Sequence, residues 1–68
     1  MTGVVKTLDK TRGFGFIRAG EGGREFFFHK LDCAERTAFN TLEVGQAVTF
    51  DEGYNPRGPR AENVAVTR

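Results

Sequence analysis

Two short runs decide how this chain folds: Arg12-Gly-Phe-Gly-Phe-Ile17 and Phe26-Phe-Phe-His29. Successive side chains of an extended strand point to opposite faces. Phe14 and Phe16 therefore share one face of the first run, with glycines on the other. Phe27 shares a face of the second run with the histidine that ends it. If the two strands pair, these four rings form one surface, which we call the aromatic patch.

Two interpretations of these rings compete, an exposed patch and a hydrophobic core. Other apolar residues already suffice for the one small core that a chain of this size can fill. They are Val4, Val5, Ile17, Phe26, Phe28, Leu31, Leu42, Val44, Val48, Phe50, Val64 and Val66. Glycines opposite Phe14 and Phe16 allow other groups to approach closely, which indicates that the glycine side is the inner face. Strand periodicity alone leaves the inner face open, and we favour the exposed patch.

Length and composition limit the class of protein. The 68 residues correspond to one domain, residues 1–68. The sequence has no apolar stretch near membrane-spanning length and no signal-peptide pattern. Cys33 is the only cysteine and the chain has one histidine, so we expect neither an internal disulfide nor a zinc site within one chain. A lone thiol fits a reducing cytosol.

The positive charge gathers where the aromatic runs lie. The whole chain has a net charge of +1. Residues 1–30 carry six Lys and Arg against three acidic residues, a net charge of +3, whereas residues 31–68 carry four against six, a net charge of −2. Cations beside aromatic side chains are the combination that a single-stranded nucleic acid requires.

Five segments read as short strands separated by turn-forming residues. They are residues 4–8, 13–18, 24–30, 45–52 and 61–67. The apolar spacing in residues 31–44 resembles a helical stripe, and we expect a loop over the turn formers of residues 53–59. We expect Tyr54 of that loop to cover one end of the fold, and Arg60, which directly follows the loop, to be solvated.

The number of strands predicts the fold class. A flat five-stranded sheet would leave exposed edges and cover only half of its core. We therefore expect an all-β fold, a five-stranded antiparallel Greek-key barrel (OB-fold) with at most one short helical turn. This fold binds oligonucleotides on strands two and three, where the aromatic runs lie. An RNA-recognition motif needs two substantial helices, for which the chain has no room.

The same residues resemble the cold-shock domain family. The run 12–17 is similar to the family motif Lys-Gly-Phe-Gly-Phe-Ile, and the run 26–29 is similar to its motif Val-Phe-Val-His. Residues 3–6 resemble the first strand of the family, residues 41–50 its fourth strand, and residues 57–64 its last loop and strand. Two motifs in this order and at this spacing make the resemblance specific, and it covers nearly the whole chain.

The resemblance implies a cytoplasmic protein that binds single-stranded RNA and DNA with low sequence specificity. Such proteins act as RNA chaperones and influence transcription and translation. The resemblance implies no chemical reaction, and the chain has neither a serine nor a second histidine from which to build a catalytic triad. We expect no enzyme, no cofactor, no small-molecule substrate, no membrane association and a monomer.

Carried over by motif, the resemblance assigns roles to individual residues. The stacking platform consists of Phe14, Phe16, Phe27, His29 and Phe39. Lys6, Arg12 and Arg57 match positions near phosphates or bases, and Asp9 and Glu25 match polar positions that hydrogen-bond base edges. Two alternatives stay open: Phe39 instead pins its loop onto the barrel, and His29 is a surface histidine without a role.

The departures from the family pattern concern Thr7, Leu8 and Lys30. The family usually has Trp-Phe where this chain has Thr7 and Leu8, and Phe where it has Lys30. We expect weaker binding because two aromatic platforms are absent, with Lys30 partly offsetting the loss by contacting a phosphate. The alternative function is a small β-barrel protein-interaction module that has lost much of its nucleic-acid affinity.

Overall fold

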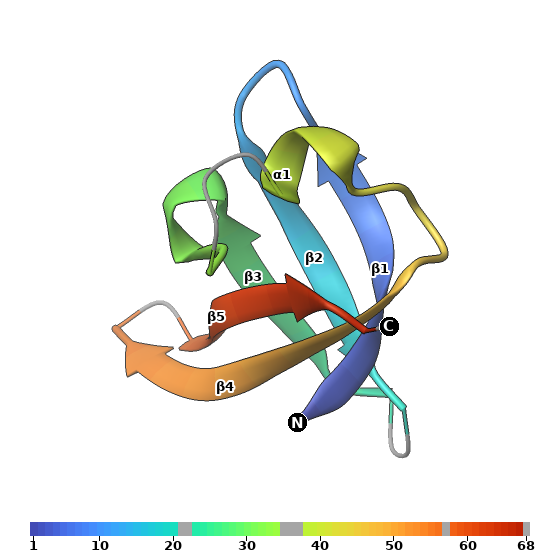
Figure 1. Cartoon of the computed structure of the whole chain (residues 1–68). Coiled ribbons are helices and arrows are strands. Elements are labelled where there is room, and N and C mark those ends of the chain that lie inside the picture. Colours follow the sequence, from blue (N-terminus) through green and yellow to red (C-terminus); the bar gives the residue numbers. More distant parts are fainter. Residues whose placement is uncertain (21–22, 35–37, 57, 68) are drawn as a thin grey trace.

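The computed structural model is a closed barrel of five strands in the order β1-β2-β3-β5-β4 (Figure 1). It describes residues 1–20, 23–34, 38–56 and 58–67. The strands are β1 (Thr2–Asp9), β2 (Phe14–Ala19), β3 (Glu25–His29), β4 (Ala47–Asn55) and β5 (Gly58–Val66). The predicted all-β, OB-type barrel is confirmed.

Strand pairing is antiparallel except where β3 meets β5. That pairing is parallel, with Phe27 opposite Arg60, and it closes the barrel. The register shifts between Val5 and Thr7 in β1, where the chain forms a bulge at Lys6. Bulges bend a strand and increase its twist, which helps a sheet of only five strands to close on itself.

The connection between β3 and β4 contains two short turns of helix. A 3-10 turn, η2, spans Lys30–Asp32, and a single α-helical turn, α1, spans Ala38–Thr41. Figure 1 shows α1 above one end of the barrel, near the loop that joins β1 to β2. Lys10 of that loop donates a hydrogen bond to the carbonyl oxygen of Asn40 at 2.9 Å, which ties the two segments together. No helix within the described ranges is long and apolar enough to cross a membrane.

The core consists of inward-facing side chains from all five strands and from the connection. Its buried members are Val5, Ile17, Ala19, Phe26, Phe28, Cys33, Phe39, Leu42, Val48, Phe50, Ala61 and Val64. The prediction of burial was wrong for Val4, Leu31 and Val44, which are exposed. Val4 points away from the core because it alternates with the buried Val5, whereas the other two lie in η2 and in the segment before β4.

Phe39 corrects one of the site predictions. Its side chain is only 2% exposed, and its ring packs edge-on against Phe28 with 6.0 Å between ring centroids. The ring anchors α1 to the core, as the pinning alternative describes. In this conformation it presents no face on which a base could stack.

The expected loop at residues 53–59 is mostly strand. Gly53 pairs with Arg60 and Tyr54 with Pro59, so β4 and β5 continue as a hairpin. Tyr54 does not cover the barrel, because 82% of it is exposed. Local turn-forming residues indicated a loop here, whereas pairing with a neighbouring strand decided the outcome. Arg57 lies outside the described residues.

The inner face of β2 is crowded at Gly15, as the sequence predicted. A Cβ atom added there would lie 2.6 Å from the carbonyl oxygen of Thr7 and 2.8 Å from a ring carbon of Phe28. Neither neighbour is the flexible end of a long side chain. The barrel therefore needs glycine at this position so that β1 and Phe28 can approach the backbone of β2.

Gly15→Ala should destabilise the protein by about 1–3 kcal/mol because the new methyl group overpacks the core. The free energy of unfolding in urea measures the loss. Gly20→Ala is the matched control, because nothing lies within 4 Å of a Cβ atom at that position. Equal stability of the two variants would show that the inner face of β2 has room to spare.

Candidate nucleic-acid interface

The structure brings the four residues of the aromatic patch together on the outer face of β2 and β3. Phe14 pairs with His29 and Phe16 pairs with Phe27 in the antiparallel register of these strands. Phe27 lies 5.9 Å from Phe14 and 5.8 Å from Phe16 between ring centroids. Phe26 and Phe28, which alternate with Phe27 and His29 in the sequence, point inward and are fully buried.

The rings of the patch are partly accessible to solvent. Phe27 is 36% exposed, while Phe14, Phe16 and His29 have intermediate exposure. The phenylalanine rings are tilted against one another by 40–62°, an arrangement that aromatic pairs prefer. Each ring is supported by its neighbours and keeps part of its surface free for another flat group.

β1 extends the patch with polar residues. Thr7 lies opposite Phe16 and Asp9 lies opposite Phe14, so both positions adjoin a ring of the patch. A carboxylate oxygen of Asp9 accepts a hydrogen bond from the backbone N–H of Arg12 at 3.0 Å, which closes the turn between β1 and β2. The guanidinium of Arg12 extends into solvent, with its Nε atom 3.8 Å from Asp9.

Lys6 and Glu25 form an ion pair at one end of the patch. The Lys6 ammonium donates a hydrogen bond of 2.5 Å to the Glu25 carboxylate. Because β2 lies between β1 and β3, the two side chains meet over the outer face of β2. This hydrogen bond and the charge of Lys6 lower the pKa of Glu25 below its usual value. The Glu25 carboxylate is therefore ionised at neutral pH.

The other end of the patch is held by Asp32. One carboxylate oxygen of Asp32 accepts a hydrogen bond from the backbone N–H of His29 at 2.8 Å. Arg60 donates to both carboxylate oxygens of Asp32, at 2.6 and 2.7 Å. The expectation that Arg60 is only solvated is wrong, and this hydrogen bond also raises the pKa of its guanidinium.

The His29 ring has a fixed orientation. Its Nδ1 atom accepts a hydrogen bond from the backbone N–H of Leu31 at 3.2 Å. In the neutral ring the proton then resides on Nε2, which faces away from this turn. The capping pattern of an acidic residue three positions after His29 could have indicated the role of Asp32. No local signal indicated that Arg60 pairs with Asp32, because the two residues are 28 positions apart in the chain.

Lys30 adjoins the patch from η2. Its backbone N–H donates to the carbonyl oxygen of Gly13 at 2.8 Å, and its side-chain carbons lie over Gly13, 3.1 Å from where a Cβ atom would be. Lys30, Leu31, Phe39 and Asn40 line a hollow at this end of the barrel. The Lys30 side chain thus lies over Gly13, which directly precedes Phe14, at the rim of this hollow.

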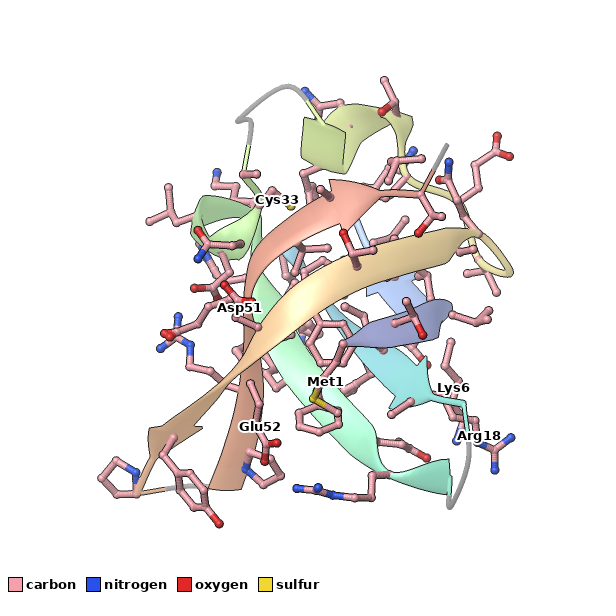
Figure 2. The ribbon with its side chains drawn as sticks, turned by 60° about the horizontal axis from the view of Figure 1, so that its bottom comes forward. Met1, Lys6, Arg18, Cys33, Asp51 and Glu52 are labelled. Atoms are coloured by element: carbon pink, nitrogen blue, oxygen red, sulfur yellow. The ribbon has the colours of Figure 1, made fainter. Side chains whose placement is uncertain are left out.

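Cys33 takes no part in the patch. Figure 2 shows it close to η2 and β5, where it forms a parallel bridge with Val64. Burial raises the pKa of its thiol to about 11, and the nearby charge of Asp32 adds to the effect. Within the part of the chain that the structure describes, no group of three or more His, Cys, Asp and Glu residues could hold a metal ion.

The Cys33 thiol should react slowly in the folded protein. With its pKa raised from 9.0 to about 11, the thiolate fraction at pH 8 is roughly a hundredfold smaller than in the unfolded chain. The rates of modification by a disulfide reagent, with and without urea, measure the difference. Equal rates would contradict the burial of the thiol.

The same shift predicts how stability depends on pH. The neutral thiol favours the fold below pH 9, and this contribution is lost as the pH rises from about 9 through about 11. Unfolding experiments across this range should show a steeper loss of stability for the native protein than for Cys33→Ala, which retains every other group that titrates there. Parallel curves would contradict the assignment.

The family model described as the 'Cold-shock' DNA-binding domain matches residues 1–67. Cold shock protein 1 of Lactiplantibacillus plantarum is 47% identical over 91% of both chains. The cold shock protein CspV of Vibrio cholerae is 41% identical over 97% of this chain and 93% of its own. The cold shock-like protein CspB of Escherichia coli is 39% identical over 98% and 93%, respectively.

Proposed function

Since this chain belongs to the cold-shock DNA-binding domain family, whose members bind nucleic acid, we propose that it binds single-stranded RNA and DNA by stacking bases on the aromatic patch. The observation that carries the proposal is the register of β2 and β3. It places Phe14, Phe16, Phe27 and His29 side by side on the outer face. Stacking on such rings tolerates any base, because every base has a π-face.

Charged residues around the patch support the same function. Arg12 and Lys30 are exposed at the turn that leads into Phe14, where the Lys30 side chain lies over Gly13, and Lys6 lies at the other end of the patch. These cations would contact the phosphates between stacked bases, which makes the affinity depend on salt. With stacking and phosphate contacts as the binding forces, sequence specificity is low.

The cellular role that fits this binding mode is that of an RNA chaperone or a regulator of transcription and translation. A protein that holds unpaired bases on its surface favours melted RNA over base-paired RNA. The role requires no catalysis and no cofactor. We propose that the protein is a cytoplasmic monomer, as the resemblance to the family implies.

A second function is favoured by one particular observation. Thr7 and Lys30 stand where the family usually has rings, and Leu31, which follows Lys30 in the sequence, is 68% exposed. A patch with fewer rings and an exposed aliphatic neighbour could dock a protein instead. The two functions differ in salt response, because nucleic-acid affinity falls with added salt whereas apolar docking does not.

Phe27→Ala should weaken binding to oligo-dT and oligo-U of about seven nucleotides by roughly tenfold, since one stacked base contributes about 1–3 kcal/mol. Fluorescence anisotropy at low and moderate salt measures the loss. Phe27→Leu is the matched control, because it retains apolar bulk but has no π-face. Thermal unfolding of both variants checks that the fold is intact.

Stacking requires that Phe27→Leu binds the oligonucleotides nearly as weakly as Phe27→Ala. Recovery of wild-type affinity by leucine would show that apolar contact suffices. Absence of any oligonucleotide binding by the native protein at low salt would overturn the proposed function and favour the protein-docking alternative.

Replacement of Thr7 or Lys30 by a ring should tighten binding. Thr7→Trp would place an indole beside Phe16, its partner in the β1–β2 pairing, and should raise the affinity about tenfold by adding one platform. Lys30→Phe should do the same while reducing the salt dependence, because it removes a phosphate contact.

Thr49→Trp is the matched control for these variants. Thr49 is an exposed threonine of β4 that pairs with Thr2 and Ala65 rather than with a residue of the patch. Its replacement should leave the affinity unchanged in the same anisotropy titration. A gain as large as that of Thr7→Trp would mean that an added indole binds nucleic acid anywhere on the barrel.

A further inference from the structure

Most cations of the described barrel surface already have a carboxylate or carbonyl partner. Arg24 donates to Glu52 at 2.9 Å, Arg60 to Asp32, and Lys10 to a backbone carbonyl. The Lys6–Glu25 pair lies at one end of the aromatic patch, and it is more exposed than the Arg60–Asp32 pair at the other end. It therefore bears directly on how the patch meets a nucleic acid.

The position of the pair follows from the strand register. Glu25 lies two residues before Phe27 on β3, so both side chains point outward. Lys6 lies at the bulge directly before Thr7, the neighbour of Phe16. The side chains of both members are nearly half exposed, at 45% and 44%. A strand of nucleic acid stacked on Phe16 and Phe27 would pass close to the pair.

The Glu25 carboxylate is also close enough to Arg18 to be affected by its charge, and the two residues are opposite each other in the β2–β3 pairing. Figure 2 shows Lys6 and Arg18 on the same side of the barrel, near the end of β2. One carboxylate thus faces two cations, and it reduces the positive potential that a phosphate would meet at this end of the patch.

We propose that Glu25 limits the affinity of the aromatic patch for nucleic acid by holding Lys6 in an ion pair and repelling the incoming phosphate. The inference rests on the proposed function. A phosphate must replace the Glu25 carboxylate as the partner of Lys6. The complex then gains a Lys6–phosphate contact but loses the Lys6–Glu25 ion pair, so the net gain in affinity is small. An exposed pair exchanges partners readily, so Glu25 tunes the affinity without abolishing binding.

This role is opposite in sign to the one that the family resemblance implies for Glu25. A carboxylate that hydrogen-bonds a base edge strengthens binding, and its removal weakens binding. A carboxylate that competes for Lys6 weakens binding, and its removal strengthens it. One substitution therefore distinguishes the two roles.

Glu25→Gln should bind oligo-dT of about seven nucleotides roughly fivefold more tightly at 50 mM salt, because Lys6 gains one phosphate contact. The slope of log K against log salt should become steeper by about 0.7 for a single strand. Fluorescence anisotropy from 50 to 300 mM salt measures both quantities.

Glu52→Gln is the matched control, because it changes the net charge equally but releases Arg24 instead of Lys6. Figure 2 shows Glu52 on β4, well apart from Lys6, and its replacement should change the affinity by less than about twofold.

The double variant Lys6→Gln, Glu25→Gln tests the pairing itself. Removal of both charges should return the affinity and the salt slope to wild-type values, because the pair is nearly neutral as a unit. A weaker double variant with a shallower slope would show that the contact of Lys6 with phosphate outweighs its pairing with Glu25 in the wild type. That result, weaker binding by Glu25→Gln, or an equal gain from Glu52→Gln would overturn the inference.

The free protein provides a measurement that is independent of nucleic acid. The pKa of Glu25, followed by NMR, should rise when Lys6 is replaced by glutamine, because the hydrogen bond and the charge that lower it are removed. Oligonucleotide binding without a Glu25→Gln effect overturns this inference alone. A pKa rise with no binding by any variant overturns the proposed function, and the inference with it.

Discussion

The close contact of Gly15 with Phe28 and with the backbone of β1 decides which face of β2 is buried. A side chain at position 15 would collide with Thr7 and with the Phe28 ring. The glycine face must therefore be the inner face, and Phe14 and Phe16 must point outward. The antiparallel register then places Phe27 and His29 beside them. The aromatic patch is thus a consequence of how the core packs.

The large inner side chains of β3 depend on the same contact. Phe28 fills the space that the glycine leaves, and Phe39 packs edge-on against it. Phe26 packs at 5.1 Å against Phe50 of β4. These rings meet from three segments of the chain, so the core is filled without the outward-facing aromatic residues. The rings of the patch therefore remain partly exposed on the outer face.

Features with a local cause could be predicted from the sequence. Alternation within the two aromatic runs predicted the strands, the patch and, with the number of strands, the barrel. Features that depend on distant segments could not be predicted. The burial of Phe39 depends on where α1 settles over the barrel, and the long β4–β5 hairpin depends on pairing across residues that usually form loops, such as Tyr54 and Pro59. The exposure of Leu31 follows from the 3-10 turn.

The ion pairs were hidden from the sequence for the same reason. Lys6 and Glu25 are 19 residues apart, and Arg60 and Asp32 are 28 apart. Counting charges along the chain placed an excess of positive charge in the first 30 residues. The structure shows that several of these cations already face a carboxylate, such as Arg24. The count therefore overstated the positive charge available to a phosphate.

Rings and charges have different effects on the same surface. A stacked base contributes more than an exposed ion pair does, so the number of rings determines whether a strand is held at all. Charges act through counterion release and determine how steeply the affinity falls with salt. Under the proposed function, Thr7 and Lys30 reduce the number of rings, and the role proposed for Glu25 reduces the available charge next to Phe16 and Phe27. The two proposals together predict a surface that holds a single strand weakly and releases it readily.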